Sequence, residues 1–191
     1  MNAALTFPSI FPHSREREDD DALLVRCRAG ERAAFDILLE RYRERVLNLA
    51  FQLLREPHAA EDVAQEVFVR AFSNIGQFRG EAALFTWLYQ ITLNQCRART
   101  RRAKDTVSFD DCEEAAQLPT SHSTENAAVY GIALERALDR LSPPLRIALL
   151  LRELHGLSYE EIARVLKLPV GTVRSRLHAA RRQFQEIWDE A

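Results

Sequence analysis

Residues 157–184 have the sequence LSYEEIARVLKLPVGTVRSRLHAARRQF, which predicts two helices joined by a short turn. Ser158 and Glu161 have the spacing of a capping box, in which each side chain bonds a backbone N–H group at the start of a helix. Pro169 interrupts the helical pattern, so the first helix is expected to last until about Leu166. This stretch therefore predicts a helix-turn-helix in the C-terminal part of the chain.

The second helix of this stretch combines an apolar stripe with a basic face. Its apolar residues recur every three or four positions and are expected to be buried: Val173, Leu177, Ala180 and Phe184. Four arginines and no acidic residue lie between positions 174 and 182, although the whole chain has a net charge of −2. Arginine binds phosphates and pairs with guanine in the major groove, so this composition is typical of a DNA recognition helix. A solvated basic helix end is the alternative interpretation.

The composition of the 191 residues is that of an ordinary globular protein, with 47% hydrophobic and 28% charged residues. The three cysteines are scattered, so neither a disulfide scaffold nor a zinc site is predicted, and no metal or cofactor is expected. Glycine and proline are sparse and alternating apolar patterns are rare, which predicts an all-α fold. We find no membrane-spanning run and no secretory signal, so we expect a cytoplasmic protein without direct membrane insertion.

Four segments are predicted along the chain from shifts in composition and periodicity. Residues 1–21 are rich in acidic residues and lack an amphipathic period, as expected of a flexible tail. Residues 22–103 form a helical domain, and residues 104–124 form an acidic, Ser/Thr-rich flexible linker. Residues 125–191 form a second helical domain that contains the helix-turn-helix. The expected architecture is thus two small helical domains on a flexible tether.

The N-terminal domain is expected to contain three helices. The first has a regular apolar stripe from Phe35 onward and ends before Pro57. The second ends near Gly76, and a loop follows at residues 77–81. The third runs over about residues 82–102. Together they would form a compact bundle close to the smallest size that sustains its own core.

Two groups of residues in this domain are candidates for binding. Asp62, Gln65 and Glu66 lie three and four positions apart and are expected on one polar side of the second helix. The loop and the third helix combine aromatic and basic residues, which suits stacking on unpaired bases and contact with phosphates of single-stranded DNA. For that role we single out Phe78, Arg79, Asn94, Arg97 and Arg101. The alternatives are a solvated polar face for the first group and core packing for the aromatic residues, and Trp87 is expected in the core.

Several motifs together resemble the extracytoplasmic-function (ECF) sigma factors of bacteria. They are AEDVAQEVF at 60–68, FRGE at 78–81, FTWL at 85–88, LSYEEIA at 157–163 and PVGTVRSR at 169–176. The resemblance covers residues 22–103 and 125–188. It implies a dissociable specificity subunit of bacterial RNA polymerase without a catalytic site of its own. One helical domain would recognise the promoter −10 element and help to open it, and the other would recognise the −35 element.

The resemblance also implies partners and residue roles. Core RNA polymerase and promoter DNA are expected partners, with Asp62, Gln65 and Glu66 at positions that dock on the clamp helices of the β′ subunit and with further contact to the β subunit. An anti-sigma factor, usually membrane-bound in this family, is expected to hide the docking surface and to hold the protein at the membrane. The expected −35 contacts are Thr172, Arg174, Ser175, Arg176, His178, Arg181 and Arg182.

Two other classes of function compete with this interpretation. A helix-turn-helix repressor or activator would have a similar C-terminal domain, but it would normally also carry a sensor or dimerisation domain. An enzyme lacks support because the chain contains no GxxxxGK[ST], HExxH or GxSxG motif. Asp62 and Glu66 lack a third clustered ligand, so a solvated pair is expected there instead of a cation site. Binding to core RNA polymerase without DNA discriminates between a sigma factor and a regulator.

Overall fold

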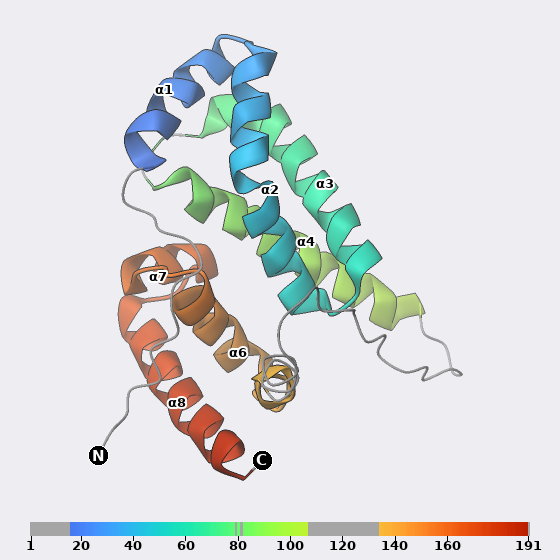
Figure 1. The fold of residues 1–191 in the computed structure, drawn as a ribbon, viewed down its shortest axis with the longest axis vertical. Coiled ribbons are helices and arrows are strands. Elements are labelled where there is room, and N and C mark those ends of the chain that lie inside the picture. The colour runs from blue at the N-terminus through green and yellow to red at the C-terminus, as the bar shows by residue number, and fades with distance from the viewer. Residues whose placement is uncertain (1–15, 79, 81, 107–133, 191) are drawn as a thin grey trace, which may run out of the picture. The chain divides into compact units, whose positions relative to one another are not determined.

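The computed structural model describes residues 16–78, 80, 82–106 and 134–190. These residues contain helices and no strand, which confirms the predicted all-α class (Figure 1). They divide into two compact units, one formed by residues 16–106 and the other by residues 134–190. Among the described helices, none combines the length and the apolar character needed to cross a bilayer.

The first unit is a bundle of four α-helices and one short 3₁₀ turn. Helix α2 packs against α1, α3 and α4, and α3 also packs on α4. The elements are α1 (Glu16–Arg28), α2 (Arg32–Leu54), α3 (Pro57–Asn74), the 3₁₀ turn η1 (Ile75–Gln77) and α4 (Leu84–Thr106). The predicted three helices are thus present, and α1 precedes them.

The core of the first unit lies between α2, α3 and α4. Tyr42 and Leu49 of α2, Val67 of α3 and Tyr89 of α4 have no exposed surface. Burying a large apolar side chain contributes about 1.5–3 kcal/mol, so this shared core holds the helices against one another. The entry into α3 is fixed locally, because the Glu56 carboxylate accepts hydrogen bonds from two backbone N–H groups of its first turn.

Helix α1 corrects the predicted N-terminal tail. It begins at Glu16, so the prediction of a flexible tail is wrong for residues 16–21. Within that acidic run Asp20 is buried, and its carboxylate accepts hydrogen bonds from Arg41 at 2.7 Å and from the Tyr42 hydroxyl. A paired, buried carboxylate anchors α1 on α2, whereas the sequence predicted a flexible acidic tail. Residues 1–15 lie outside the described part of the chain.

Helix α4 corrects the start of the predicted linker. It continues through Thr106, so residues 104–106 are helical where a linker was expected. The remainder of the predicted linker, residues 107–124, lies outside the described residues. The predicted start of the second domain at residue 125 also falls there.

The second unit contains the predicted helix-turn-helix. Residues 134–139 are helical, and four elements follow. They are α6 (Pro143–Leu149), η2 (Leu150–Leu154), α7 (Tyr159–Leu166) and α8 (Val170–Asp189). Element η2 is a π-helical turn that continues α6, and the periodicity of the sequence did not indicate it. Ser142 is the N-cap of α6, and Pro143 is its first residue.

The local signals at the start of α7 are confirmed. The Glu161 N–H donates to the Ser158 hydroxyl at 3.2 Å, and the Ser158 N–H donates to the Glu161 carboxylate at 2.8 Å. The helix ends at Lys167, which adopts the left-handed conformation with φ of 55°. Helix α8 then buries the predicted apolar stripe: Val173, Leu177, Ala180 and Phe184. The opposite face of α8 is therefore available for other contacts.

Candidate functional site

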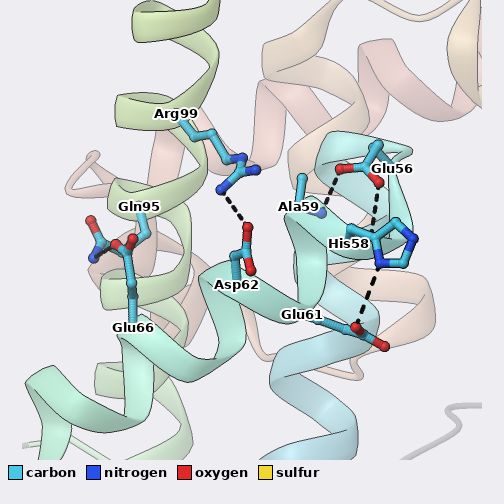
Figure 2. Close-up of polar contacts among 8 residues, drawn as sticks. All are labelled: Glu56, His58, Ala59, Glu61, Asp62, Glu66, Gln95 and Arg99. Carbon is cyan, nitrogen blue, oxygen red and sulfur yellow. Dashed lines mark hydrogen bonds and ion pairs between the residues drawn. The ribbon is translucent and has the colours of Figure 1, made fainter.

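The polar face of α3 is tied to α4 by two side-chain contacts (Figure 2). The Asp62 carboxylate pairs with the Arg99 guanidinium at 3.1 Å, and the Gln95 amide donates to the Glu66 carboxylate at 2.7 Å. Asp62 and Glu66 are both exposed. The structure thus brings these two predicted residues together, one turn apart and facing the same neighbouring helix.

Gln65 lies on a different side of α3 from its two predicted companions. It lines a groove of about 630 Å³, formed by residues of α2 and α3. The groove is partly apolar, because Val69 and Phe72 are 66% and 48% exposed. Phe72 rests its ring edge-on against Phe35 with 5.0 Å between ring centroids. The prediction that all three polar residues share one side therefore holds only for Asp62 and Glu66.

The apolar part of this groove was not predicted from the sequence. Val69 and Phe72 fall outside the buried stripe of α3, and large apolar residues on the outer side of an amphipathic helix are the signal that would have found it. Single exposed apolar residues are common on protein surfaces, so only their position beside α2 makes the pair noteworthy.

A second hollow, of about 340 Å³, lies where α3, η1 and α4 meet. Carboxamides and one indole dominate its walls, and such groups can hydrogen-bond and stack on a nucleobase. Its lining residues are Arg70, Asn74, Gln77, Trp87, Ile91, Asn94 and Gln95. Of the residues predicted for single-stranded DNA, Asn94 is in this lining.

The two aromatic residues near this hollow differ from expectation. Phe78 is buried, with 7% of its surface exposed, and packs against Trp87 with 5.2 Å between ring centroids. Trp87 is half-buried and lines the hollow. Phe78, predicted to contact DNA, is therefore buried and packs behind Trp87. Trp87, predicted in the core, is partly exposed in the wall of the hollow. Arg79, also predicted here, lies outside the described residues.

Basic side chains extend this surface along α4. Arg97 and Arg101 are exposed, and with Asn94 they lie three and seven positions apart on one face of the helix. A hydrogen bond from α1 fixes the segment after α3, because the Arg28 guanidinium donates to the Phe78 carbonyl oxygen. The hollow and the basic face together offer contacts for a base and for phosphates.

The polar face of α8 presents the predicted −35 residues. Arg174, Ser175 and His178 are exposed, whereas Thr172 and Arg176 are half-buried. Two further arginines differ in their partners. Arg182 faces Glu186 of the same helix at 3.7 Å, whereas Arg181 reaches Glu153 of η2 at 2.6 Å.

Neither a metal centre nor a reactive thiol is built by the described residues. No group of three His, Cys, Asp or Glu side chains there could hold a metal ion. Cys27 and Cys96 are both buried and free. Burial raises the pKa of both thiols, to about 12 for Cys96. Such groups are protonated at neutral pH and react slowly. Cys112 lies outside the described residues.

Comparison with known proteins identifies the chain. The family described as Sigma-70 region 2 matches residues 38–106, and the family described as Sigma-70, region 4 matches residues 132–184. The RNA polymerase sigma-H factor of Pseudomonas aeruginosa is 39% identical over 176 residues, which cover 86% of this chain and 91% of that protein. The ECF RNA polymerase sigma-E factor of Escherichia coli K12 is 36% identical over 177 residues, which cover 87% and 92%.

This chain belongs to the ECF sigma factors. As a sigma factor it gives core RNA polymerase its promoter specificity in transcription initiation. That assignment decides against a helix-turn-helix regulator that is not a polymerase subunit. The region 2 match falls on the first unit, and the region 4 match covers the described helices up to residue 184 of α8.

Two solved structures of related chains agree with the fold of this ECF sigma factor. CnrH, solved in complex with the cytosolic domain of CnrY, superposes with a TM-score of 0.70 at 25% identity, covering 90% of this chain and 97% of that one. The sigma factor RpoE of Bartonella quintana, solved in complex with the anti-sigma factor NepR, superposes with a TM-score of 0.66 at 27% identity, covering 81% and 96%.

Proposed function

We propose that this sigma factor divides its partners between surfaces built by different helices. In this proposal the first unit, residues 16–106, binds core polymerase and opens the −10 element. The domain formed by residues 125–191 recognises the −35 element, and the segment between them is a tether. The observation that carries the proposal is the presence of three distinct surfaces among the described residues: the polar face of α3, the hollow beside α4, and the exposed face of α8.

The core-binding surface is proposed to include Asp62, Glu66 and Gln65. The carboxylates of Asp62 and Glu66 are exposed. Arg99 and Gln95 hold them in place, so they are oriented before a partner binds. Gln65 adds a polar group at the neighbouring groove. We assign this surface to the clamp helices of the β′ subunit, with further contact to the β subunit elsewhere on the protein.

The −10 surface is proposed to be the hollow of Trp87 and Asn94 with the basic face of α4. A base extracted from the duplex loses stacking worth a few kcal/mol, and an aromatic and amide-lined hollow can return part of it. Arg97 and Arg101 are placed to follow the strand's phosphates, and Arg79 is proposed to do the same. In this proposal Phe78 supports Trp87 and does not itself stack on DNA.

The −35 surface is proposed to be the exposed face of α8. The contacts assigned to it are Thr172, Arg174, Ser175, Arg176, His178 and Arg182. Arginine and histidine donors suit both base edges and phosphates, and Ser175 and Thr172 add short polar groups. A buried stripe on the opposite face keeps the helix fixed on its domain while the exposed face contacts DNA.

An anti-sigma factor is proposed as the controlling partner. The support is the apolar part of the α2–α3 groove, which lies beside the proposed core-binding residues, together with the solved complex of a related sigma factor with an anti-sigma factor. A partner seated there would block the docking of core polymerase. We place the protein in the cytoplasm with polymerase and DNA, held at the membrane when such a partner is itself membrane-bound. It is proposed to have no catalytic site of its own.

Run-off transcription tests the proposed function directly. Purified bacterial core polymerase is incubated with genomic fragments, including the region upstream of this protein's own gene, with and without the protein. We expect start sites that depend on the protein, and their upstream sequences identify its −10 and −35 elements. The absence of protein-dependent starts, with intact DNA binding, would contradict the proposal.

Two pairs of substitutions test the assignment of surfaces. Changing Arg174→Glu with Arg176→Glu is expected to abolish −35 recognition and to leave binding to core polymerase nearly unchanged. Changing Asp62→Ala with Gln65→Ala is expected to weaken binding to core polymerase and to leave −35 recognition nearly unchanged. Equal loss of both activities in either pair would overturn the division between the two surfaces.

A further inference from the structure

Arg181 of α8 binds two residues that lie outside its own helix, Glu153 and Tyr159. Two of its N–H groups, on Nη2 and Nε, converge on one oxygen of Glu153 at 2.6 and 3.0 Å. A third, on Nη1, reaches the Tyr159 hydroxyl at 3.4 Å. Because Glu153 belongs to η2 and Tyr159 is the first residue of α7, one guanidinium joins three elements of the helix-turn-helix.

A second arginine completes this cluster from the other side of Tyr159. The Arg152 guanidinium lies 5.3 Å from the centre of the Tyr159 ring, a cation–π contact. It also donates to the Leu157 carbonyl oxygen at 2.7 Å, in the turn before α7. The tyrosine is therefore held through its ring by Arg152 and through its hydroxyl by Arg181.

The burial of Glu153 gives the cluster its strength. The glutamate side chain is only 13% exposed, so its carboxylate depends on Arg181 for a compensating charge. Burial by itself lowers the pKa of Arg181, but the hydrogen bonds that its guanidinium donates to Glu153 and Tyr159, together with the charge of Glu153, outweigh that effect and raise the pKa. The π-helical turn carries Glu153 in η2, so an irregular segment of the chain supplies the anchor.

We infer that Arg181 is a positioning residue that fixes the recognition helix against η2 and α7 through Glu153 and Tyr159, and that it does not bind DNA. The inference rests on the proposed −35 role of α8. It separates Arg181 from Arg182, whose side chain is 71% exposed and forms a longer ion pair, 3.7 Å, with Glu186 of its own helix.

The position of the cluster on α8 explains its expected effect on DNA recognition. Arg181 lies seven positions, or about two turns, after Arg174 on the same side of the helix. Releasing this fixed point would let α8 change its tilt on the domain. Base contacts tolerate misplacements of only about half an ångström, whereas phosphate attraction tolerates much more. Loss of the cluster is therefore expected to reduce sequence specificity more than overall affinity for DNA.

The test compares promoter DNA with the same DNA in which the −35 element is scrambled. The full chain, assembled with core polymerase, is titrated with both duplexes at several salt concentrations, using the promoter found by run-off transcription. For Arg181→Gln we expect the ratio of the two affinities to fall about threefold to tenfold, with the salt dependence of binding unchanged. The matched control Arg182→Gln should weaken both duplexes alike and lower the salt slope by about 0.9.

Glu153→Gln gives the sharpest distinction, since it keeps the size of the side chain and removes its charge. If Glu153 anchors Arg181, the affinity ratio falls as in Arg181→Gln, and the double variant is no worse than either single variant. Tyr159→Phe, which removes only the hydroxyl, should lower the ratio less. Thermal unfolding of each full-length variant shows whether it folds. If Arg181→Gln does not fold, Glu153→Gln and Tyr159→Phe still test the inference.

Two outcomes would overturn the inference. One is that Arg181→Gln lowers the salt slope and preserves the ratio, as a phosphate contact would. The other is that Glu153→Gln keeps or raises the ratio, as expected if the glutamate merely restrains a DNA-binding arginine. Failure of the unmodified holoenzyme to prefer the promoter duplex would instead contradict the proposed −35 role of α8.

Discussion

The Gln95 amide of α4 donates to the Glu66 carboxylate of α3 at 2.7 Å, and Gln95 also lines the hollow proposed for a promoter base. One hydrogen bond therefore joins the proposed polymerase-docking face to the proposed DNA site. Docking of a protein on Glu66 would act directly on a side chain in the wall of the hollow.

Asp62→Ala is expected to lower the affinity for core polymerase about tenfold and to leave stability almost unchanged. The ion pair with Arg99 is exposed, and such pairs contribute about 0.2–1 kcal/mol. A charged hydrogen bond to a partner is worth more, about 1.5–3 kcal/mol. Fluorescence anisotropy with labelled protein measures the affinity, and urea unfolding measures the stability. Arg99→Ala breaks the same ion pair but keeps the carboxylate, so it should bind core polymerase better than Asp62→Ala does.

Arg28→Ala is expected to impair promoter opening without weakening the affinity for core polymerase. Its guanidinium holds the Phe78 carbonyl, and Phe78 supports Trp87 at the hollow. A hydrogen bond from a charged group contributes about 1.5–3 kcal/mol, so its loss corresponds to a decrease in open complexes of about tenfold or more. Permanganate reactivity of thymines in the −10 element reports the opening. Arg26→Ala is the control, because Arg26 in the same helix pairs with Glu31 at the exposed surface. Equal loss of opening in both variants would contradict the role of Arg28.

Ser158→Ala is expected to destabilise the second unit by about 1 kcal/mol, because α7 loses one half of its capping box. Urea unfolding followed by circular dichroism measures the change. The control is Ser175→Ala, since Ser175 donates to the Thr172 carbonyl on the exposed face of α8. That change should stay within about 0.5 kcal/mol. A loss as large in the control would mean that the capping box has no special effect.

Cys96 is expected to make stability fall at alkaline pH. Burial raises the pKa of its thiol to about 12 in the folded protein, whereas the pKa of an unfolded cysteine is about 8.5. Between these two values the unfolded state loses its proton first, so the unfolding free energy decreases as the pH rises. Urea unfolding at neutral and alkaline pH measures this decrease. The alkaline decrease should be smaller in Cys96→Ala, and an equal slope in both proteins would contradict the assignment.

The sequence predicted best those features that depend on neighbouring residues. The capping box of Ser158 and Glu161 and the buried stripe of α8 need only short-range spacing, and both are present. The start of α1 could not be predicted in this way, because Asp20 is buried by contacts with Arg41 and Tyr42 of another helix. An acidic run looks solvated until its partners are known.

The predicted sites show the same distinction. Spacing placed Asp62 and Glu66 together, but only the packing of α2 beside α3 shows that Gln65 belongs to a groove. The environments of Phe78 and Trp87 could not be ranked from sequence, because both are large aromatic residues near one loop. The partner of Arg181 could not be predicted from local spacing either, since Glu153 is 28 positions away along the chain.

Helix α8 separates the residues that hold it in place from those proposed to meet DNA, and this has an evolutionary consequence. Val173 and Leu177 are confined by the core, whereas Arg174, Ser175 and His178 are exposed. Substitutions at the exposed positions cost little stability, so they can accumulate after gene duplication without loss of the fold. Duplicate copies of such a protein can therefore acquire different sets of target genes by a few mutations on one helix face.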